Sequence, residues 1–182
     1  MRLLSRRAVL WAMSAWLAGG LSLSTSLAQP STSFRPTPNA TLCDQGEATV
    51  FSCPIGQKVV SLCSVHRPDK TVLLRYVFGK PGRPELTLTS ASASAAPMTY
   101  GGLSYSGGGG DYVRVRNGRF SYVVYQASGH GWEQQGLVVE RNRRRISARR
   151  CGGARLALGP NRWRDVYAAH LPDDPLGFEK PD

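Results

Sequence analysis

The residue types that most often carry out catalysis occur in this chain without forming a recognised motif. His66, His130 and His170 are far apart, and neither an H-E-x-x-H motif nor a G-x-S-x-G nucleophile turn occurs. The 12 acidic residues offer many carboxylate pairs and single out none. Gly129-His130-Gly131-Trp132 is interpreted as a glycine-rich turn with an exposed histidine and a packing tryptophan. We therefore expect a protein that is not an enzyme and holds no cofactor or metal.

The four cysteines have the clearest chemistry of any residues in the sequence: Cys43, Cys53, Cys63 and Cys151. None has the C-x-x-C spacing of a zinc site, and export to an oxidising compartment, argued below, makes two disulfides the expectation. Three pairings remain open. Cys151 is distant from the other three, so its bridge closes a loop of roughly a hundred residues and stabilises the fold by about 4 kcal/mol.

A glycine-rich stretch between Tyr105 and Tyr112 is a candidate contact loop. It reads Tyr-Ser-Gly-Gly-Gly-Gly-Asp-Tyr, and such glycines let the backbone approach a partner closely. We interpret it as a flexible probe with Ser106, Gly108 and Tyr112 as partner-binding residues. The alternative is a glycine bulge that turns one strand into the next. The helix that a phosphate-binding loop needs does not follow.

Arginines form the second candidate binding feature, in a chain with a formal net charge of +11. Arg114, Arg116 and Arg119 flank an Asn-Gly turn and are assigned to partner binding. A further run consists of Arg141, Arg143, Arg144, Arg145, Arg149, Arg150 and Arg155. The pattern predicts a stripe for an anionic partner, whereas the alternative is a solvated edge that blocks sheet-to-sheet aggregation. Nucleic acid is not expected as the physiological partner of an exported protein.

Residues 1–28 have the three-part layout of a cleaved export signal. Arginines precede an apolar run from Ala8 to Leu23, and Ser26-Leu27-Ala28 supplies the cleavage site. Arg6 and Arg7 fit either the twin-arginine route or an ordinary charged start. The apolar run is shorter than a spanning helix, so no membrane span is expected after cleavage and the product is expected to be periplasmic or secreted.

The remaining chain predicts one small β-domain. Residues 29–42 are expected to form a flexible leader, residues 43–171 the β-domain and residues 172–182 an irregular tail. Strands are predicted over residues 48–53, 58–64, 71–78, 85–89, 103–106, 112–116, 119–125, 137–140 and 146–151. Residues 162–170 fit a last strand or a single short helix. The fold class is therefore all-β, a small antiparallel β-barrel or sandwich with two disulfides.

Asn117-Gly118 is the strongest local signal, because Asn-Gly favours a two-residue hairpin turn. A turn formed by these two residues pairs Arg116 with Arg119. One face of the hairpin is then apolar and the other carries the arginines. Facing arginines destabilise the pair by up to about 1 kcal/mol unless an anion lies between them.

Several stretches carry a resemblance to known proteins: Phe51-Ser-Cys-Pro, Val60-Ser-Leu-Cys63, Leu74-Arg-Tyr-Val-Phe-Gly79 with Glu85-Leu86, and Ser106-Gly-Gly-Gly-Gly-Asp-Tyr112. With their FSC…SLC pattern they resemble a group of uncharacterised exported proteins of Gram-negative bacteria, which implies no activity. The serine–glycine loop that ends in tyrosine is also similar to the loop that periplasmic lysozyme inhibitors, small disulfide-bonded β-barrels, insert into the enzyme cleft. That similarity implies that Ser106 and Tyr112 are the inserted contacts.

These features predict an exported periplasmic non-catalytic binding protein, lysozyme-inhibitor-like, whose first candidate partner is a cell-wall hydrolase. One alternative is an immunity protein that neutralises an acidic toxin delivered to the periplasm, since basic charge favours an acidic protein partner. The other is a binder of an anionic envelope polymer, which would show steep salt dependence.

Overall fold

The computed structural model of the chain describes residues 36–37, 40–90, 97–151 and 163–181. The predicted signal peptide, most of the predicted leader and Arg155 lie outside these residues. Within them the chain forms two antiparallel sheets and one short helix. Both sheets are open and form a sandwich-like arrangement, so the predicted all-β class with two disulfides is confirmed and the sandwich is favoured over the closed barrel.

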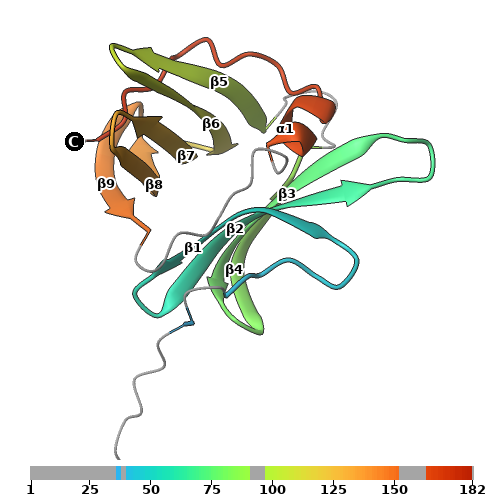
Figure 1. The fold of residues 1–182 in the computed structure, drawn as a ribbon. Coiled ribbons are helices and arrows are strands. Elements are labelled where there is room, and N and C mark those ends of the chain that lie inside the picture. Colours follow the sequence, from blue (N-terminus) through green and yellow to red (C-terminus); the bar gives the residue numbers. More distant parts are fainter. Residues whose placement is uncertain (1–35, 38–39, 91–96, 152–162, 182) are drawn as a thin grey trace, which may run out of the picture. The chain divides into compact units, whose positions relative to one another are not determined.

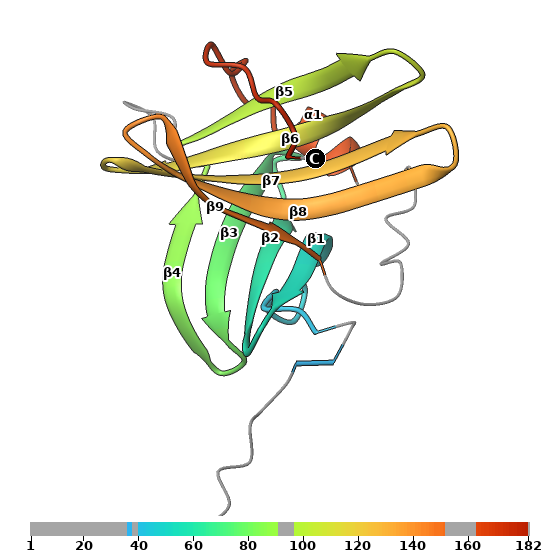
Figure 2. The same ribbon diagram turned by 90° about the vertical axis from the view of Figure 1, so that its left-hand side faces the viewer.

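Each sheet is a simple meander of strands in chain order (Figures 1 and 2). The four-stranded sheet consists of β1 (Ala48–Ile55), β2 (Lys58–His66), β3 (Val72–Lys80) and β4 (Arg83–Thr89). The five-stranded sheet consists of β5 (Met98–Tyr105), β6 (Gly108–Asn117), β7 (Phe120–Gly129), β8 (Trp132–Arg141) and β9 (Arg144–Arg150). Helix α1 (Arg164–Ala168) resolves the strand-or-helix alternative for residues 162–170 in favour of a helix.

Alternating apolar residues of both sheets meet in one buried cluster. From the four-stranded sheet it contains Phe51, Leu62 and Tyr76, and from the five-stranded sheet Val113 and Val124. The disulfide between Cys53 and Cys151 adds a covalent link between β1 and the residue that follows β9, across 98 residues of sequence. The predicted long loop is confirmed, and the fold is held by a shared core and a cross-link between the sheets.

The β6–β7 hairpin has a register that differs from the prediction. Asn117 pairs with Phe120 and Arg116 with Ser121, so the turn residues are Gly118 and Arg119. Gly118 has φ +58°, which a turn with glycine in its first central position requires. The pairing of Arg116 with Arg119 is therefore wrong. The shift amounts to two residues, so each side chain keeps its predicted face and Val113 still points into the core.

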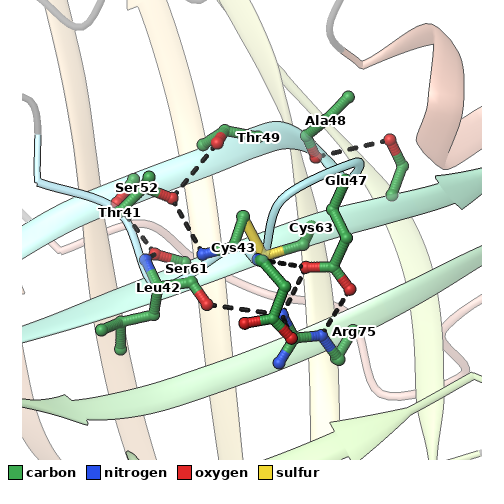
Figure 3. The surroundings of a disulfide bond; sticks show 12 residues. Thr41, Leu42, Cys43, Glu47, Ala48, Thr49, Ser52, Ser61, Cys63 and Arg75 are labelled. Carbon is green, nitrogen blue, oxygen red and sulfur yellow. Dashed lines mark hydrogen bonds and ion pairs between the residues drawn. A yellow bond between two sulfur atoms is a disulfide. The ribbon is translucent and has the colours of Figure 1, made fainter. Parts of the chain in front are cut away.

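The segment before β1 covers the outer face of the four-stranded sheet (Figure 3). The Cys43–Cys63 disulfide fastens it to β2, and the backbone N–H of Leu42 donates to Ser61 Oγ at 3.0 Å. Arg75 Nε donates to Glu47 Oε1 at 2.7 Å. Although burial raises the pKa of Glu47, hydrogen bonds from Arg75 and from the N–H of Asp44 lower it below its usual value. The last part of the predicted leader is thus held on the sheet.

The two disulfides indicate an oxidising compartment, since such bonds persist outside the reducing cytosol. Helix α1 has five residues, and no helix in the described part of the chain has the length and apolarity to cross a bilayer.

Candidate anion-binding surface

The predicted glycine loop is a tight hairpin turn. Ser106 and Gly107 form the two-residue turn between β5 and β6, and both are exposed. The next glycines belong to β6, so the prediction of a flexible loop is wrong. Gly108 is needed for close packing, because a Cβ there would lie 2.6 Å from Cε2 of Tyr105. Of the predicted probe, only the Ser106–Gly107 turn projects outward.

Two predicted contact residues are buried. Tyr112 is 2% exposed and Arg114 is 1% exposed, so neither is available to a partner on the surface, and their assignment as exposed contacts is corrected. The cover is the chain's own C-terminal segment. Phe178 packs on Tyr112 with ring centroids 5.1 Å apart, and Pro181 O accepts a 2.9 Å hydrogen bond from Gln134 Nε2. In Figure 1 this segment, drawn in red, passes β5 and ends beside β8 and β9.

Arg114 is neutralised by a buried network. Its Nε donates to Asp174 at 2.8 Å, its Nη1 donates to Glu140, and its Nη2 donates to Gly177 O at 2.7 Å. Tyr112 Oη donates to Asp174 at 3.0 Å. Burial first, and then the Asp174 charge, raises the pKa of Tyr112. A buried guanidinium needs such partners, so Arg114 fastens the C-terminal segment to the sheet and is not part of an open anion site.

The predicted irregular tail therefore has a structural role. Apart from an isolated bridge between Tyr100 and Asp173, residues 172–181 form neither strand nor helix. Their backbone nevertheless borders β5, because Tyr100 N–H donates to Pro172 O at 3.0 Å and Asp174 N–H donates to Tyr100 O at 2.7 Å. These bonds pair part of an otherwise open sheet edge.

The β8–β9 hairpin carries the largest group of exposed arginines. We call residues 141–150 the arginine hairpin; its arginines are Arg141, Arg143, Arg144, Arg145, Arg149 and Arg150, and all are exposed. Among the residues that the structure describes, none of the six forms a salt bridge with an acidic side chain. The carboxylate nearest along the strand, Glu140, is already bonded to Arg114.

Two more predicted arginines lie at the same end of the sheet. Arg116 and Arg119 are exposed at the β6–β7 turn. The backbone N–H of Asn142 donates to Arg119 O at 2.9 Å, which joins that turn to the β8–β9 turn. The structure thus brings two separate arginine groups of the sequence to one end of the five-stranded sheet.

Arg143 adopts an unusual backbone conformation. The turn residues Asn142 and Arg143 have φ values of 49° and 65°, in the left-handed region. Asparagine adopts this conformation readily, whereas for arginine it costs roughly 1–2 kcal/mol of conformational energy. Glycine is the usual residue at this turn position. Strained residues of this kind are enriched at functional sites. Lys70 and His170 also have positive φ values, so the conformation alone does not assign a function to Arg143.

A polar cavity of about 500 Å³ lies between the arginine hairpin and the C-terminal segment. Its walls are Arg114, Glu140, Arg143, Arg145 and residues Leu176, Gly177, Phe178 and Glu179. Arg114 and Glu140 form an ion pair with each other. Among the residues that line the cavity, Arg143 and Arg145 are therefore the cations that could bind an anion.

Among the described residues, His66 and Ser64 share the carboxylate of Asp165. His66 Nε2 lies 3.1 Å from Asp165 Oδ2, and Ser64 Oγ donates to the same carboxylate oxygen. In a serine triad the histidine must contact the serine, and here both contact the aspartate instead. Cys43, Glu47 and Cys63 are close enough to suggest a metal site, but the two sulfurs are bonded to each other.

Sequence reasoning missed the acidic partners of Arg114 and the strain at Arg143. Asp174 lies 60 residues from Arg114 in the sequence, and no local sequence pattern indicates that the two are in contact. The turn residues could have given a signal, since Asn142-Arg143 stands where Asn-Gly is usual.

The comparisons with known proteins add no relative. No protein-family model matches the chain, and neither a curated protein nor a solved structure matches it.

Proposed function

We propose that this protein is an exported, non-catalytic binding protein of the bacterial envelope that holds an anionic polymer on its arginine hairpin. The observation that carries the proposal is the group of exposed arginines that lack an acidic partner among the described residues. Guanidinium groups held close together repel one another, and an anionic chain across them removes that repulsion. The disulfides and the signal-like residues 1–28 support export to the periplasm.

The length of the arginine hairpin favours a polymer over a small anion. From Arg144 to Arg150 the strand rises by roughly 20 Å, at about 3.3 Å per residue. A single phosphate or carboxylate reaches only one part of that stripe. Side chains alternate between the two faces of β9, which is the edge strand of its sheet, so a chain of repeated negative charges that follows this edge contacts arginines of both faces. Such binding weakens steeply as salt screens the charges.

The test is binding to polyphosphate at increasing sodium chloride. The double variant Arg144→Gln/Arg149→Gln should bind more weakly and with a smaller salt dependence, because fewer counterions are released. The matched control is Lys80→Gln/Arg83→Gln, which removes the same charge from exposed positions at the β3–β4 turn. Equal losses in both variants would mean that net charge alone, and not the arginine hairpin, governs binding.

An inhibitor of a cell-wall hydrolase is a second candidate function. It is supported by the exposed Ser106–Gly107 turn, which a two-stranded hairpin holds out at the end of the sheet. Titration of the protein into lysis assays with lysozymes of several structural types tests it. Stoichiometric inhibition that Ser106→Trp abolishes supports this function, whereas no inhibition at micromolar protein removes it.

An immunity protein against an acidic toxin would use the same arginine hairpin. Protein and polymer partners are separated by stoichiometry, since a toxin forms a complex of fixed ratio. Binding to polyphosphate that strengthens with chain length favours the polymer.

A further inference from the structure

Two aromatic rings lie on a pair of glycines at the other end of the five-stranded sheet, by the β5–β6 and β7–β8 turns. Gly108 on β6 and Gly129 on β7 are cross-strand partners. A Cβ at Gly108 would lie 2.6 Å from Cε2 of Tyr105, and one at Gly129 would lie 2.5 Å from Nε1 of Trp132. At Gly108 a Cβ would also lie 2.3 Å from the backbone oxygen of Ser128, so both the rings and the neighbouring backbone require glycine at this pair.

We call Tyr105 and Trp132 the aromatic platform. Their rings are stacked, with an angle of 20° between the ring planes and centroids 5.7 Å apart, so the Tyr105 ring supports the Trp132 ring. The Tyr105 hydroxyl donates to Gly109 O at 3.0 Å, which holds that ring in place. Trp132 remains 37% exposed, which is unusual for the largest apolar side chain.

A pocket of about 300 Å³ opens beside Trp132. Its lining residues are Trp132, Glu133, Gln134, Gln135, Arg150, Cys151 and Lys180. Lys180 Nζ lies 5.0 Å from the Trp132 ring centroid and 6.0 Å from that of Tyr105. The pocket thus combines one aromatic wall, two side-chain amides, two cations and one carboxylate.

We propose that this pocket binds a carboxylated sugar ring, so that the polymer held by the arginine hairpin is an acidic polysaccharide. The C–H face of a sugar ring packs on an indole ring, while its hydroxyls form hydrogen bonds with amide groups. Arg150 and Lys180 supply positive charge for the carboxylate. The inference rests on the proposed function, because Arg150 belongs both to the arginine hairpin and to the pocket.

The arginine hairpin and the aromatic platform are connected around Tyr125. Burial raises the pKa of Tyr125, while the hydrogen bond from Gln134 and the charges of Arg150 and Arg145 oppose that rise. Arg150 pairs with Gly136, where a Cβ would lie 2.8 Å from the Tyr125 hydroxyl, and Gln134 Nε2 donates to that hydroxyl at 2.8 Å. Along β8, eight residues separate the Arg145 end from Trp132, or roughly 26 Å at about 3.3 Å per residue, enough for several sugar units.

The experiment compares three polymers at constant salt: polygalacturonate, which has carboxylated rings; polyphosphate, which has charge without rings; and dextran, which has rings without charge. Trp132→Ala should weaken polygalacturonate binding about tenfold and leave polyphosphate binding within twofold, because only a ring packs on the indole. Trp132→Phe should retain most of the affinity. The control is Tyr167→Ala, which removes an exposed aromatic ring on α1.

The outcomes separate the inference from the proposed function. If Trp132→Ala weakens both anionic polymers equally, or neither, the sugar pocket is refuted while the arginine hairpin stands. If the unaltered protein binds neither polygalacturonate nor polyphosphate, the proposed function fails as well. Tryptophan fluorescence gives a second test in case Trp132→Ala does not fold. A fluorescence change on adding polygalacturonate that is lost in Trp132→Phe supports the pocket, and the absence of any change refutes it.

Discussion

Replacement of Arg143 by glycine should stabilise the fold while weakening polymer binding. Arg143 has φ 65°, which costs an L-residue roughly 1–2 kcal/mol and glycine almost nothing. Glycine also lowers the free energy of unfolding by about 0.4–1 kcal/mol, because the unfolded chain has more conformational freedom at a glycine than at an arginine. The difference is a gain of about 0.5–1 kcal/mol in the free energy of unfolding, or about 2–3 °C in the melting temperature for a chain of this size.

Arg144→Gly is the matched control for that change. It removes the same charge one residue further on, but Arg144 is a strand residue without positive φ, so glycine there should cost about 0.5–1 kcal/mol. Thermal and urea unfolding of the two variants measure the stability difference, and polyphosphate binding measures the function. Destabilisation by Arg143→Gly, or a polyphosphate affinity that it leaves unchanged, would refute the idea that a strained arginine is kept for binding.

Three further predictions concern the interactions that hold the fold together. Replacing Cys53 and Cys151 by alanine should lower the free energy of unfolding by about 4 kcal/mol, since the bridge closes a loop of 98 residues; urea denaturation under non-reducing conditions measures it. Arg114→Met should cost about 3–5 kcal/mol, because the carboxylate of Asp174 stays buried without its cation, and restoration by an added Asp174→Asn change checks the cause. Because the pKa of Glu47 is lowered in the fold, its ionised carboxylate stabilises the fold above a pH of about 4.5, and this contribution is lost as the pH falls through the folded pKa. A Glu47→Gln variant should therefore lose less stability on acidification than the unaltered protein.

The strands were predictable because their signals are local. Alternating apolar residues and turn residues located most strands to within a few positions, but β5 begins at Met98 and β8 at Trp132, each five residues before the predicted starts at Leu103 and Leu137. Thr99 to Gly102 gave no clear alternation, and the C-terminal segment that borders this edge is distant in sequence. The β6–β7 register failed for a local reason: Gly118 serves as the first turn residue where Asn117 was expected to do so.

The positive charge of the candidate site could be predicted from the sequence, but which of its residues are exposed could not. The arginine run is plain in the sequence, and its placement on one hairpin follows from the strand prediction. The burial of Tyr112 and Arg114 depends on Asp174 and Phe178, which reach them only through the fold. The aromatic platform was missed for a similar reason, because Tyr105 and Trp132 meet only across the paired glycines of β6 and β7.

The most direct test of the arginine hairpin as the binding surface is a titration of the ¹⁵N-labelled protein with polygalacturonate, followed by amide chemical shifts. The largest shifts should fall on Arg141 to Arg150, extend along β8 to Trp132, and disappear at high salt. Shifts confined to the Ser106–Gly107 turn, or spread evenly over the exposed cations of both sheets, would contradict this assignment.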